Sequence, residues 1–251
     1  MALHLENVVI DAHDPRTLGR WWAEAMGWVV HVECDDEVDV CERLADDGTF
    51  LFPELVFVPV DDPEPGRERI HLDMNSFSLD DQRATVDRLL SMGATHADVG
   101  QAADAGFVVL TDPEGNTFCV LDPRPEFAHL GSLAGYTLAA HDARALRDLW
   151  LAATGWELTG DEPDHVALSP PGGGADLEII TRPTMPHRDA KNRIHLDVRP
   201  GPGDDQAAAV DQLVALGARR VEVGQSDGPP VSWVVLADPE GNELCVLSSE
   251  A

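Results

Sequence analysis

The chain has 251 residues and a formal net charge of −29 at pH 7, with 46 acidic residues against 17 lysines and arginines. Because nucleic-acid binding needs Lys and Arg side chains that neutralise phosphates, this charge argues against a nucleic-acid partner and against an anionic membrane surface. No apolar stretch reaches the roughly 20 residues that span a bilayer. The four cysteines have no paired metal spacing and Met1–Glu6 lacks the features of a secretory signal, so we expect reduced thiols and a cytoplasmic protein.

The first half of the chain alternates short extended segments with amphipathic helices. A strand is predicted around 5–10. The helix that follows carries Leu18, Trp21, Trp22, Ala25 and Met26 on one face, at the spacing of a helix laid on a core, and ends at Gly27. The remaining elements expected in this half are strands near 29–34, 41–45 and 55–60, a strand from 70, a helix at about 81–92, and strands near 96–99, 107–110 and 117–121.

The second half repeats the first. The segment Ile70-His71-Leu72-Asp73 returns 124 residues later, and Asp-Pro-Glu-Gly-Asn at 112–116 returns 126 residues later. Across 70–101 and 107–121, 27 of 47 positions are identical, which excludes chance. Before residue 70 the match is weaker and the offset is 128. We therefore predict an α+β protein of two tandem domains, 1–127 and 135–251, joined by a linker at 128–134, with two βαβββ modules in each domain.

Three features carry a resemblance to a known superfamily. They are the helix end Met26-Gly27-Trp28 with its counterpart Thr154-Gly155-Trp156, the strands with His71 and His195, and the Asp112–Asn116 turn with the strand after it. Together they resemble the vicinal oxygen chelate superfamily, which includes glyoxalase I, extradiol dioxygenases and bleomycin-resistance proteins. The resemblance covers essentially the whole chain and implies that paired modules wrap their sheets into cups around a ligand or metal. It implies no single reaction, because one scaffold supports several chemistries.

The resemblance also implies where metal ligands would lie. Metal-dependent relatives take one ligand from the first and one from the last strand of each module, and counting along this chain places these four positions on Asn7, Glu54, His71 and Cys119 in the first copy. In the second copy they fall on Gly135, Glu178, His195 and Cys245. The histidines and glutamates are good ligands, while asparagine, glycine and cysteine depart from the usual set. Two alternatives stay open: one divalent metal (Zn, Fe, Ni or Mn) per intact cup, or none.

Strand parity supports polar cups. His71 and Asp73 share one face of their strand, as do His195 and Asp197, while their neighbours Ile70 and Leu72 face the other way. Phe107 and Trp233 are the aromatic residues expected to touch a ligand. Asp14 and Asp142 are expected to cap helices, and the Asp112–Asn116 segment to form a turn without a chemical role.

Two functions fit these residues. The first is a lyase- or isomerase-type enzyme that acts on a small oxygenated metabolite, with Glu54, His71, Glu178 and His195 as catalytic residues. The second is a metal-free binding protein, of the antibiotic-resistance type, for a cationic or drug-like ligand. Both predict a small-molecule partner and a monomer or homodimer, and we favour the enzyme because the Glu and His pair occurs in both copies at one spacing.

Overall fold

The computed structural model describes residues 3–42, 53–61, 69–102, 104–182, 191–223 and 231–249. Four βαβββ modules follow one another along the chain, as predicted. The first copy contains β1 (Leu3–Ala12), α1 (Pro15–Met26), β2 (Val29–Glu33), β3 (Val38–Cys41) and β4 (Glu54–Pro59), then β5 (Ile70–Met74), α2 (Leu79–Ser91), β6 (Thr95–His96), β7 (Phe107–Thr111) and β8 (Thr117–Leu121). A short 3-10 turn, η1 (Pro125–Phe127), leads to the second copy.

The second copy repeats this order. It contains β9 (Leu133–Ala140), α3 (Ala143–Thr154), β10 (Glu157–Glu162), β11 (His165–Ser169) and β12 (Asp176–Thr181), then β13 (Ile194–Pro200), α4 (Gln206–Ala215), β14 (Arg219–Arg220), β15 (Val234–Ala237) and β16 (Glu243–Val246). Strand β9 begins at Leu133, one residue before the predicted end of the linker at 134. Strand β3 lies earlier than the predicted 41–45, since it ends at Cys41, and residues 43–45 are outside the described part of the chain.

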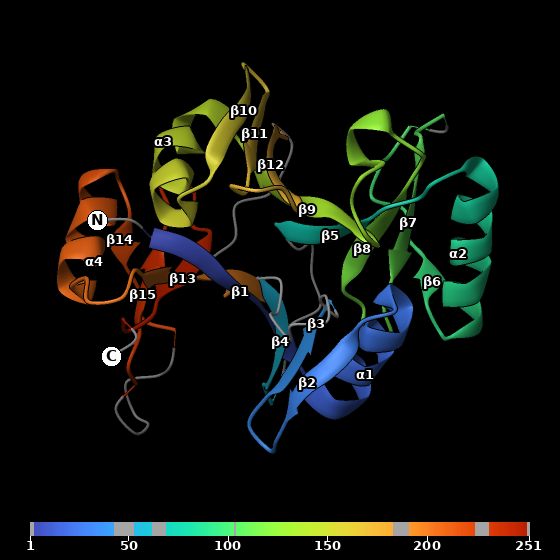
Figure 1. Cartoon of the computed structure of the whole chain (residues 1–251), viewed down its shortest axis with the longest axis horizontal. Coiled ribbons are helices and arrows are strands. Elements are labelled where there is room, and N and C mark those ends of the chain that lie inside the picture. The colour runs from blue at the N-terminus through green and yellow to red at the C-terminus, as the bar shows by residue number, and fades with distance from the viewer. Residues whose placement is uncertain are drawn as a thin grey trace.

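The modules pair across the two copies. Sheet A has the order β14-β15-β16-β13-β1-β4-β3-β2 and therefore joins the first module to the fourth, whereas sheet B, β10-β11-β12-β9-β5-β8-β7-β6, joins the second to the third. Figure 1 shows this as blue strands continuing into orange and red ones, and green strands into yellow ones. The sequence grouping of site positions by copy is therefore not the grouping in space: each concave sheet face takes residues from both copies.

The central join is antiparallel in both sheets. In sheet A, Asn7 stands opposite Asp197 and Val9 opposite His195. In sheet B, Asp73 stands opposite Gly135 and His71 opposite Thr137. Residues of one parity line the concave face, and those of the other parity face the helices, as the predicted alternation requires.

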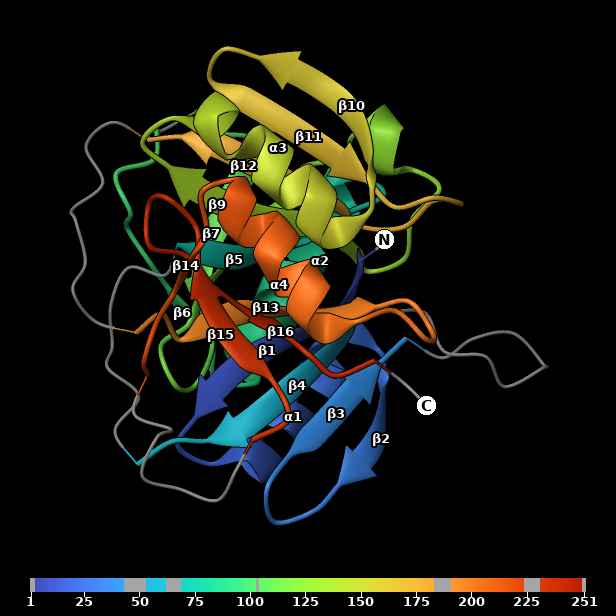
Figure 2. The same cartoon turned by 90° about the vertical axis from the view of Figure 1, so that its left-hand side faces the viewer.

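One apolar core joins the helix-covered faces of the two sheets. Trp22 of α1 and Trp150 of α3 are buried in it, and each indole Nε1 donates to a buried aspartate, Asp112 at 3.0 Å and Asp238 at 3.1 Å. Helices α3 and α4 lie side by side, as the two views agree (Figures 1 and 2). The core therefore holds the sheets by their convex faces and leaves the concave faces for other residues.

The expected structural roles of the helix-end and turn residues are confirmed. Asp14 Oδ1 accepts from Thr17 N at 3.1 Å and Asp142 Oδ1 from Ala145 N at 3.2 Å, so both are N-caps. Asp112 accepts from the backbone N–H groups of Glu114 and Asn116 and so shapes the turn between β7 and β8. Within the described ranges, no helix is long and apolar enough to cross a membrane.

Candidate functional site

The concave face of sheet B encloses a cavity of about 650 Å³, a volume within the usual range for small-molecule sites. Both copies contribute to its wall: β5, β7 and β8 from the first copy, and β9, β11 and β12 from the second. The predicted residues His71, Asp73, Phe107, Cys119, Gly135 and Glu178 all line it. His71 and Cys119 come from the first copy and Glu178 comes from the second. The cavity therefore brings together predicted residues of both copies.

On one wall, Asp73 is the centre of a polar cluster. Thr137 Oγ1 donates to Asp73 Oδ2 at 2.6 Å, the Cys119 thiol donates to the same carboxylate, and His71 Nε2 lies 3.5 Å from Oδ1. Burial alone would raise the pKa of Asp73, but His71 and these donors outweigh it, and the pKa lies below its ordinary value. The pKa of the Cys119 thiol is raised, first by burial and then by the Asp73 charge. Asp73 is therefore ionised and is placed to orient His71.

On β12, the neighbour of β9 in the same sheet, Glu178 is paired with His165. Glu178 lies opposite Thr137 across β9 and β12, and its Oε2 contacts His165 Nε2. Burial raises the pKa of Glu178 above its ordinary value, and the hydrogen bond from His165 opposes this shift. A carboxylate with a raised pKa that faces a cavity is suited to accept and return a proton.

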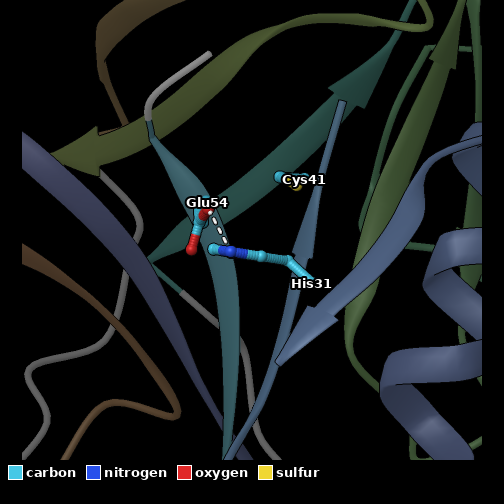
Figure 3. Close-up of side chains that lie close together, drawn as sticks. All are labelled: His31, Cys41 and Glu54. Atoms are coloured by element: carbon cyan, nitrogen blue, oxygen red, sulfur yellow. Dashed lines mark hydrogen bonds and ion pairs between the residues drawn. The ribbon is translucent and has the colours of Figure 1, made fainter. Parts of the chain in front are cut away.

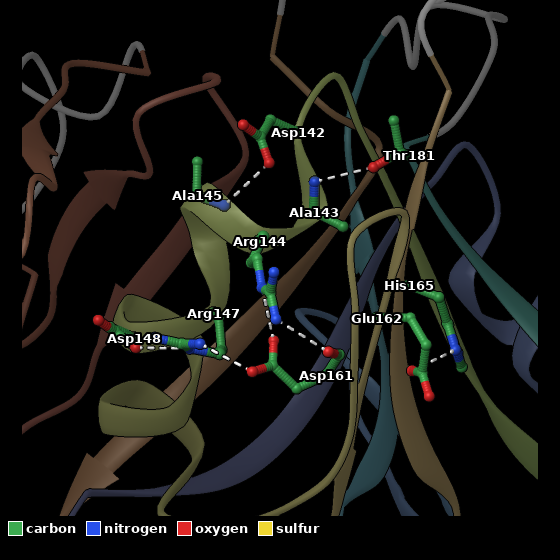
Figure 4. Close-up of polar contacts among 10 residues, drawn as sticks. All are labelled: Asp142, Ala143, Arg144, Ala145, Arg147, Asp148, Asp161, Glu162, His165 and Thr181. Carbon is green, nitrogen blue, oxygen red and sulfur yellow. Dashed lines mark hydrogen bonds and ion pairs between the residues drawn. The ribbon is translucent and has the colours of Figure 1, made fainter.

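The hairpin that carries His165 is fixed from outside by helix α3. Arg144 Nε donates to Asp161 Oδ1 and Arg147 Nη1 to Asp161 Oδ2, both at 3.0 Å (Figure 4). The ring of His165 also lies 3.6 Å from exposed Glu162 through Nδ1. Asp161 therefore anchors β10 to α3, which holds His165 in place beside Glu178.

Two arginines complete the cavity. Arg124 and Arg182 both line it, and both are close enough to Cys119 to lower its pKa against the effect of burial. Arg124 also lies over the ring of Phe127, with 5.9 Å between the guanidinium carbon and the ring centroid. In a chain with few cations, two guanidinium groups in one cavity provide a binding point for an anionic or oxygen-rich group.

The remaining predicted residues lie on the concave face of sheet A. Glu54, Asn7, Asp197 and Cys245 follow one another across β4, β1, β13 and β16, and His195 lies beside them on β13. His195 and Asp197 are 3.5 Å apart, and within the described residues His195 Nδ1 and Asp197 Oδ1 have no hydrogen-bond partner. Burial lowers the pKa of His195 to about 3 and raises that of Asp197 to about 7. Trp233 lies just before β15, at the position that Phe107 occupies at the start of β7.

A family model described as a glyoxalase-like domain matches residues 7–121 and again 135–247. The chain belongs to the glyoxalase-like domain family. This confirms the predicted superfamily and the tandem arrangement.

Solved structures of low sequence identity share the fold. Glyoxalase I from Zea mays is 15% identical, with a TM-score of 0.65 over 98% of this chain and 92% of that one. A single-substitution variant of the maize enzyme reaches a TM-score of 0.70 at 16% identity, with the same coverage. The cppA protein from Streptococcus pneumoniae TIGR4 is 10% identical, with a TM-score of 0.50 over 99% of this chain and 97% of that one. No curated protein matches the sequence. At these identities the likeness establishes the fold and not the reaction.

The register of the strands changes one equivalence that the sequence suggested. Glu54 and Glu178 both precede a histidine by 17 residues, but Glu54 pairs with Asn7, whereas the residue that pairs with Gly135 is Asp176. The β3–β4 connection is longer than the β11–β12 connection, and the β4–β5 connection is shorter than the β12–β13 connection. Counting back from the histidine by the same number of residues therefore misses the equivalent residue of the second copy by two positions. A slip of two keeps the side chain on the same face and is invisible to parity.

The superfamily's four-strand metal set does not fit the residues around the sheet-B cavity. Gly135 offers no donor, Asp176 at the register of Glu54 is hydrogen-bonded to Ser169, and the Cys119 thiol keeps its proton toward Asp73. Glu54, grouped with His71 and Cys119 by the sequence, lies on the other sheet. Groups of possible ligands do occur in the described part of the chain: His71 with Asp73 and Cys119, His195 with Asp197 and Cys245, and His31 with Cys41 and Glu54.

Sequence reasoning missed several residues of these faces. His165, Thr137, Arg124 and Arg182 belong to the cavity but not to any repeated motif, and His31 was not considered. Only a strand register could assign His165 to Glu178, because the two residues are brought together by the pairing of β11 with β12.

Proposed function

We propose that this glyoxalase-like protein binds a small oxygenated metabolite in the sheet-B cavity and acts on it as a lyase- or isomerase-type enzyme. The observation that supports the proposal is that two acid–base pairs line one cavity. Glu178 with His165 lies on one side of Thr137, and His71 with Asp73 lies on the other. The proposal needs no metal at the four strand positions.

The chemistry follows from the two pairs. Glu178, whose pKa is raised by burial, accepts the proton from a carbon next to a carbonyl group and can return it to a neighbouring carbon. In its imidazolium form, His71 keeps the Nε2 proton toward ionised Asp73 and donates the Nδ1 proton in a hydrogen bond to the carbonyl oxygen as negative charge develops there. Arg124 and Arg182 favour a substrate that carries a carboxylate or another oxygen-rich group away from the reacting carbon.

Proton exchange tests this proposal directly. The protein would be incubated in D₂O with a panel of α-hydroxy and α-keto carboxylates, and ¹H NMR would follow loss of the signal from protons on the carbon next to the carbonyl group. For a compound that exchanges, we expect Glu178→Gln to slow exchange by about 100-fold or more, because general acid–base catalysis contributes on this scale.

A matched control lies on the neighbouring hairpin. Glu162 contacts the same His165 ring from the solvent side and is largely exposed, so Glu162→Gln should keep exchange within about twofold. Full exchange in Glu178→Gln would overturn the acid–base role. Compounds that raise the melting temperature without exchanging would instead favour the metal-free binding protein, a role consistent with the internally paired side chains of the cavity.

A further inference from the structure

A second polar cluster lies on sheet A, away from the sheet-B cavity. It consists of His31, Asp39, Cys41 and Glu54, on strands β2, β3 and β4, and is called the β2–β4 cluster below. His31 Nδ1 and Glu54 Oε1 are 3.1 Å apart, and one ligand atom from each of His31, Cys41 and Glu54 lies within 4.8 Å of the others. Figure 3 shows the imidazole and the carboxylate pointing toward each other, with Cys41 on the strand between.

A β-bulge places the histidine in this cluster. Val30 pairs with Val40 and Val32 pairs with Asp39, so His31 is the extra residue of β2. Bulges redirect side chains and bend the strand locally. Here the bulge allows His31 to reach across β3 to Glu54 on the next strand but one.

The other members are buried and face the same side. Asp39 and Cys41 are two residues apart on β3 and therefore share the concave face with Glu54. Cys41 is fully buried, and Asp39 is 9% exposed. Among the described residues, Asp39 Oδ1 has no hydrogen-bond partner although it is buried. A buried oxygen without a donor is costly, and a bound cation would supply the partner that it lacks.

The second copy provides an internal comparison at the same four positions. The second copy has a bulge at the equivalent position. Leu158 pairs with Leu168 and Gly160 with Ala167, so Thr159 is the extra residue. By strand register, the counterparts of His31, Asp39, Cys41 and Glu54 are Thr159, Ala167, Ser169 and Asp176.

These counterparts form an ordinary hydrogen-bonded group. Thr159 Oγ1 and Ser169 Oγ are 2.9 Å apart, and Ser169 also bonds to the Asp176 side chain. Three of the four positions thus lose a strong metal donor together, His to Thr, Asp to Ala and Cys to Ser. If the fold itself required these donor residues, both copies would contain them. The donor residues of the first copy therefore have a cause other than folding.

We propose that the β2–β4 cluster binds a zinc-class divalent cation through His31 Nδ1, Cys41 Sγ and a carboxylate oxygen of Glu54, with Asp39 as a nearby counter-charge and water as the fourth ligand. Mixed nitrogen, thiolate and carboxylate donors in a four-coordinate set are typical of zinc. Binding displaces the thiol proton and the His31–Glu54 contact, and gives Asp39 its missing partner.

The other two possible ligand groups are poorer candidates. In each, the thiol donates to the neighbouring aspartate, Cys119 to Asp73 and Cys245 to Asp197. Within the described residues, Cys41 has no such acceptor. The β2–β4 cluster also draws three of its four members from β2 and β3, strands outside the first and last positions of a module. The site is therefore independent of the function proposed for the sheet-B cavity.

Cobalt is the probe for this site, because thiolate coordination gives Co²⁺ a charge-transfer absorption that can be assigned to one cysteine. The full chain, freed of metal by chelator, would be titrated with Co²⁺ and then with Zn²⁺ in competition. We expect one equivalent of Co²⁺ per chain with the thiolate band, and its complete displacement by one equivalent of Zn²⁺.

The second copy supplies the variants. Cys41→Ser and His31→Thr introduce the residues of the second copy, and we expect each to weaken Co²⁺ binding by about 100-fold or more, since a ligand matters at least as much as its supporting contacts. Cys119→Ser, Cys245→Ser and Cys34→Ser are the controls and should keep the band. His31 is partly exposed, so His31→Thr tests the site even if the buried Cys41 variant fails to fold.

Three results would overturn the proposal. They are the absence of a thiolate band in the wild type, a band that survives in Cys41→Ser, and a band that is lost in Cys119→Ser or Cys245→Ser. Elemental analysis of the same samples gives the stoichiometry without reference to any activity.

Discussion

The concave faces of the two sheets differ far more than the faces that pack on the core. The helix-facing positions are apolar in both sheets, as with Ile10 and Leu138 or Leu55 and Leu177. On the concave side, Asp11 and Asp39 of sheet A correspond to Ala139 and Ala167 of sheet B. Packing therefore fixes the fold through one set of alternating positions and leaves the other set free to diverge in chemistry.

This difference gives each sheet its own role. Sheet B has a cavity whose carboxylates are paired with histidines or hydroxyl groups and whose wall includes two arginines. Sheet A has buried carboxylates with unpartnered oxygens in the described part of the chain, at Asp39 and Asp197. The proposals assign turnover to sheet B and cation binding to sheet A.

The largest expected effect tests the packing that both copies share. Gly27 and Gly155 end α1 and α3 with φ values of 69° and 68°, a region that favours glycine. A Cβ at Gly27 meets nothing within 4 Å, but at Gly155 it lies 2.2 Å from the carbonyl oxygen of Leu3. Gly155→Ala should cost about 3 kcal/mol of unfolding free energy and Gly27→Ala about 1 kcal/mol, measured by urea unfolding. Equal costs would show that β1 and α3 can move apart at this contact without a cost in unfolding free energy.

The next effect concerns the single lysine. Lys191 Nζ bonds both carboxylate oxygens of Asp11, at 2.7 and 2.8 Å, and burial raises the pKa of Asp11 while Lys191 opposes the rise. Lys191→Met leaves that carboxyl group buried without its partner and should cost about 2 kcal/mol, a value reduced because Lys191 is partly exposed. Sheet B has Ala139 at the Asp11 position, so adding Asp11→Ala should recover at least half of the loss. A double variant as unstable as Lys191→Met would contradict this explanation.

The sequence predicted the parts of this protein that depend on local patterns. The modules, the helices with their caps at Asp14 and Asp142, and the concave position of His71 all follow from periodicity and repeats. Module pairing does not, because four modules with similar apolar faces satisfy the same alternation whichever partner they take. For that reason counting along the sequence groups Glu54 with His71, although the structure places them on different sheets. His31 escaped notice because its bulge breaks the strand pattern, and only the offset to Thr159 reveals that both copies share it.

The smallest expected effect is a pH dependence that belongs to sheet A. Burial lowers the pKa of His195 to about 3 from the ordinary 6.5, so between these values the unfolded chain binds a proton that the folded chain does not. Raising the pH from 5 to 7 therefore stabilises the folded state through this group. Asp197 acts in the opposite direction, since its pKa of about 7 makes the folded state bind the extra proton.

Comparing variants separates the two groups. The gain in unfolding free energy from pH 5 to 7 should be smaller in His195→Gln than in the wild type by about 1 kcal/mol, and larger in Asp197→Asn. The exposed His96 on β6 provides the control, and His96→Gln should leave the wild-type profile unchanged. A wild-type profile in His195→Gln would mean that His195 is hydrated in the folded state, and the concave face of sheet A would then be open to water rather than closed around its carboxylates.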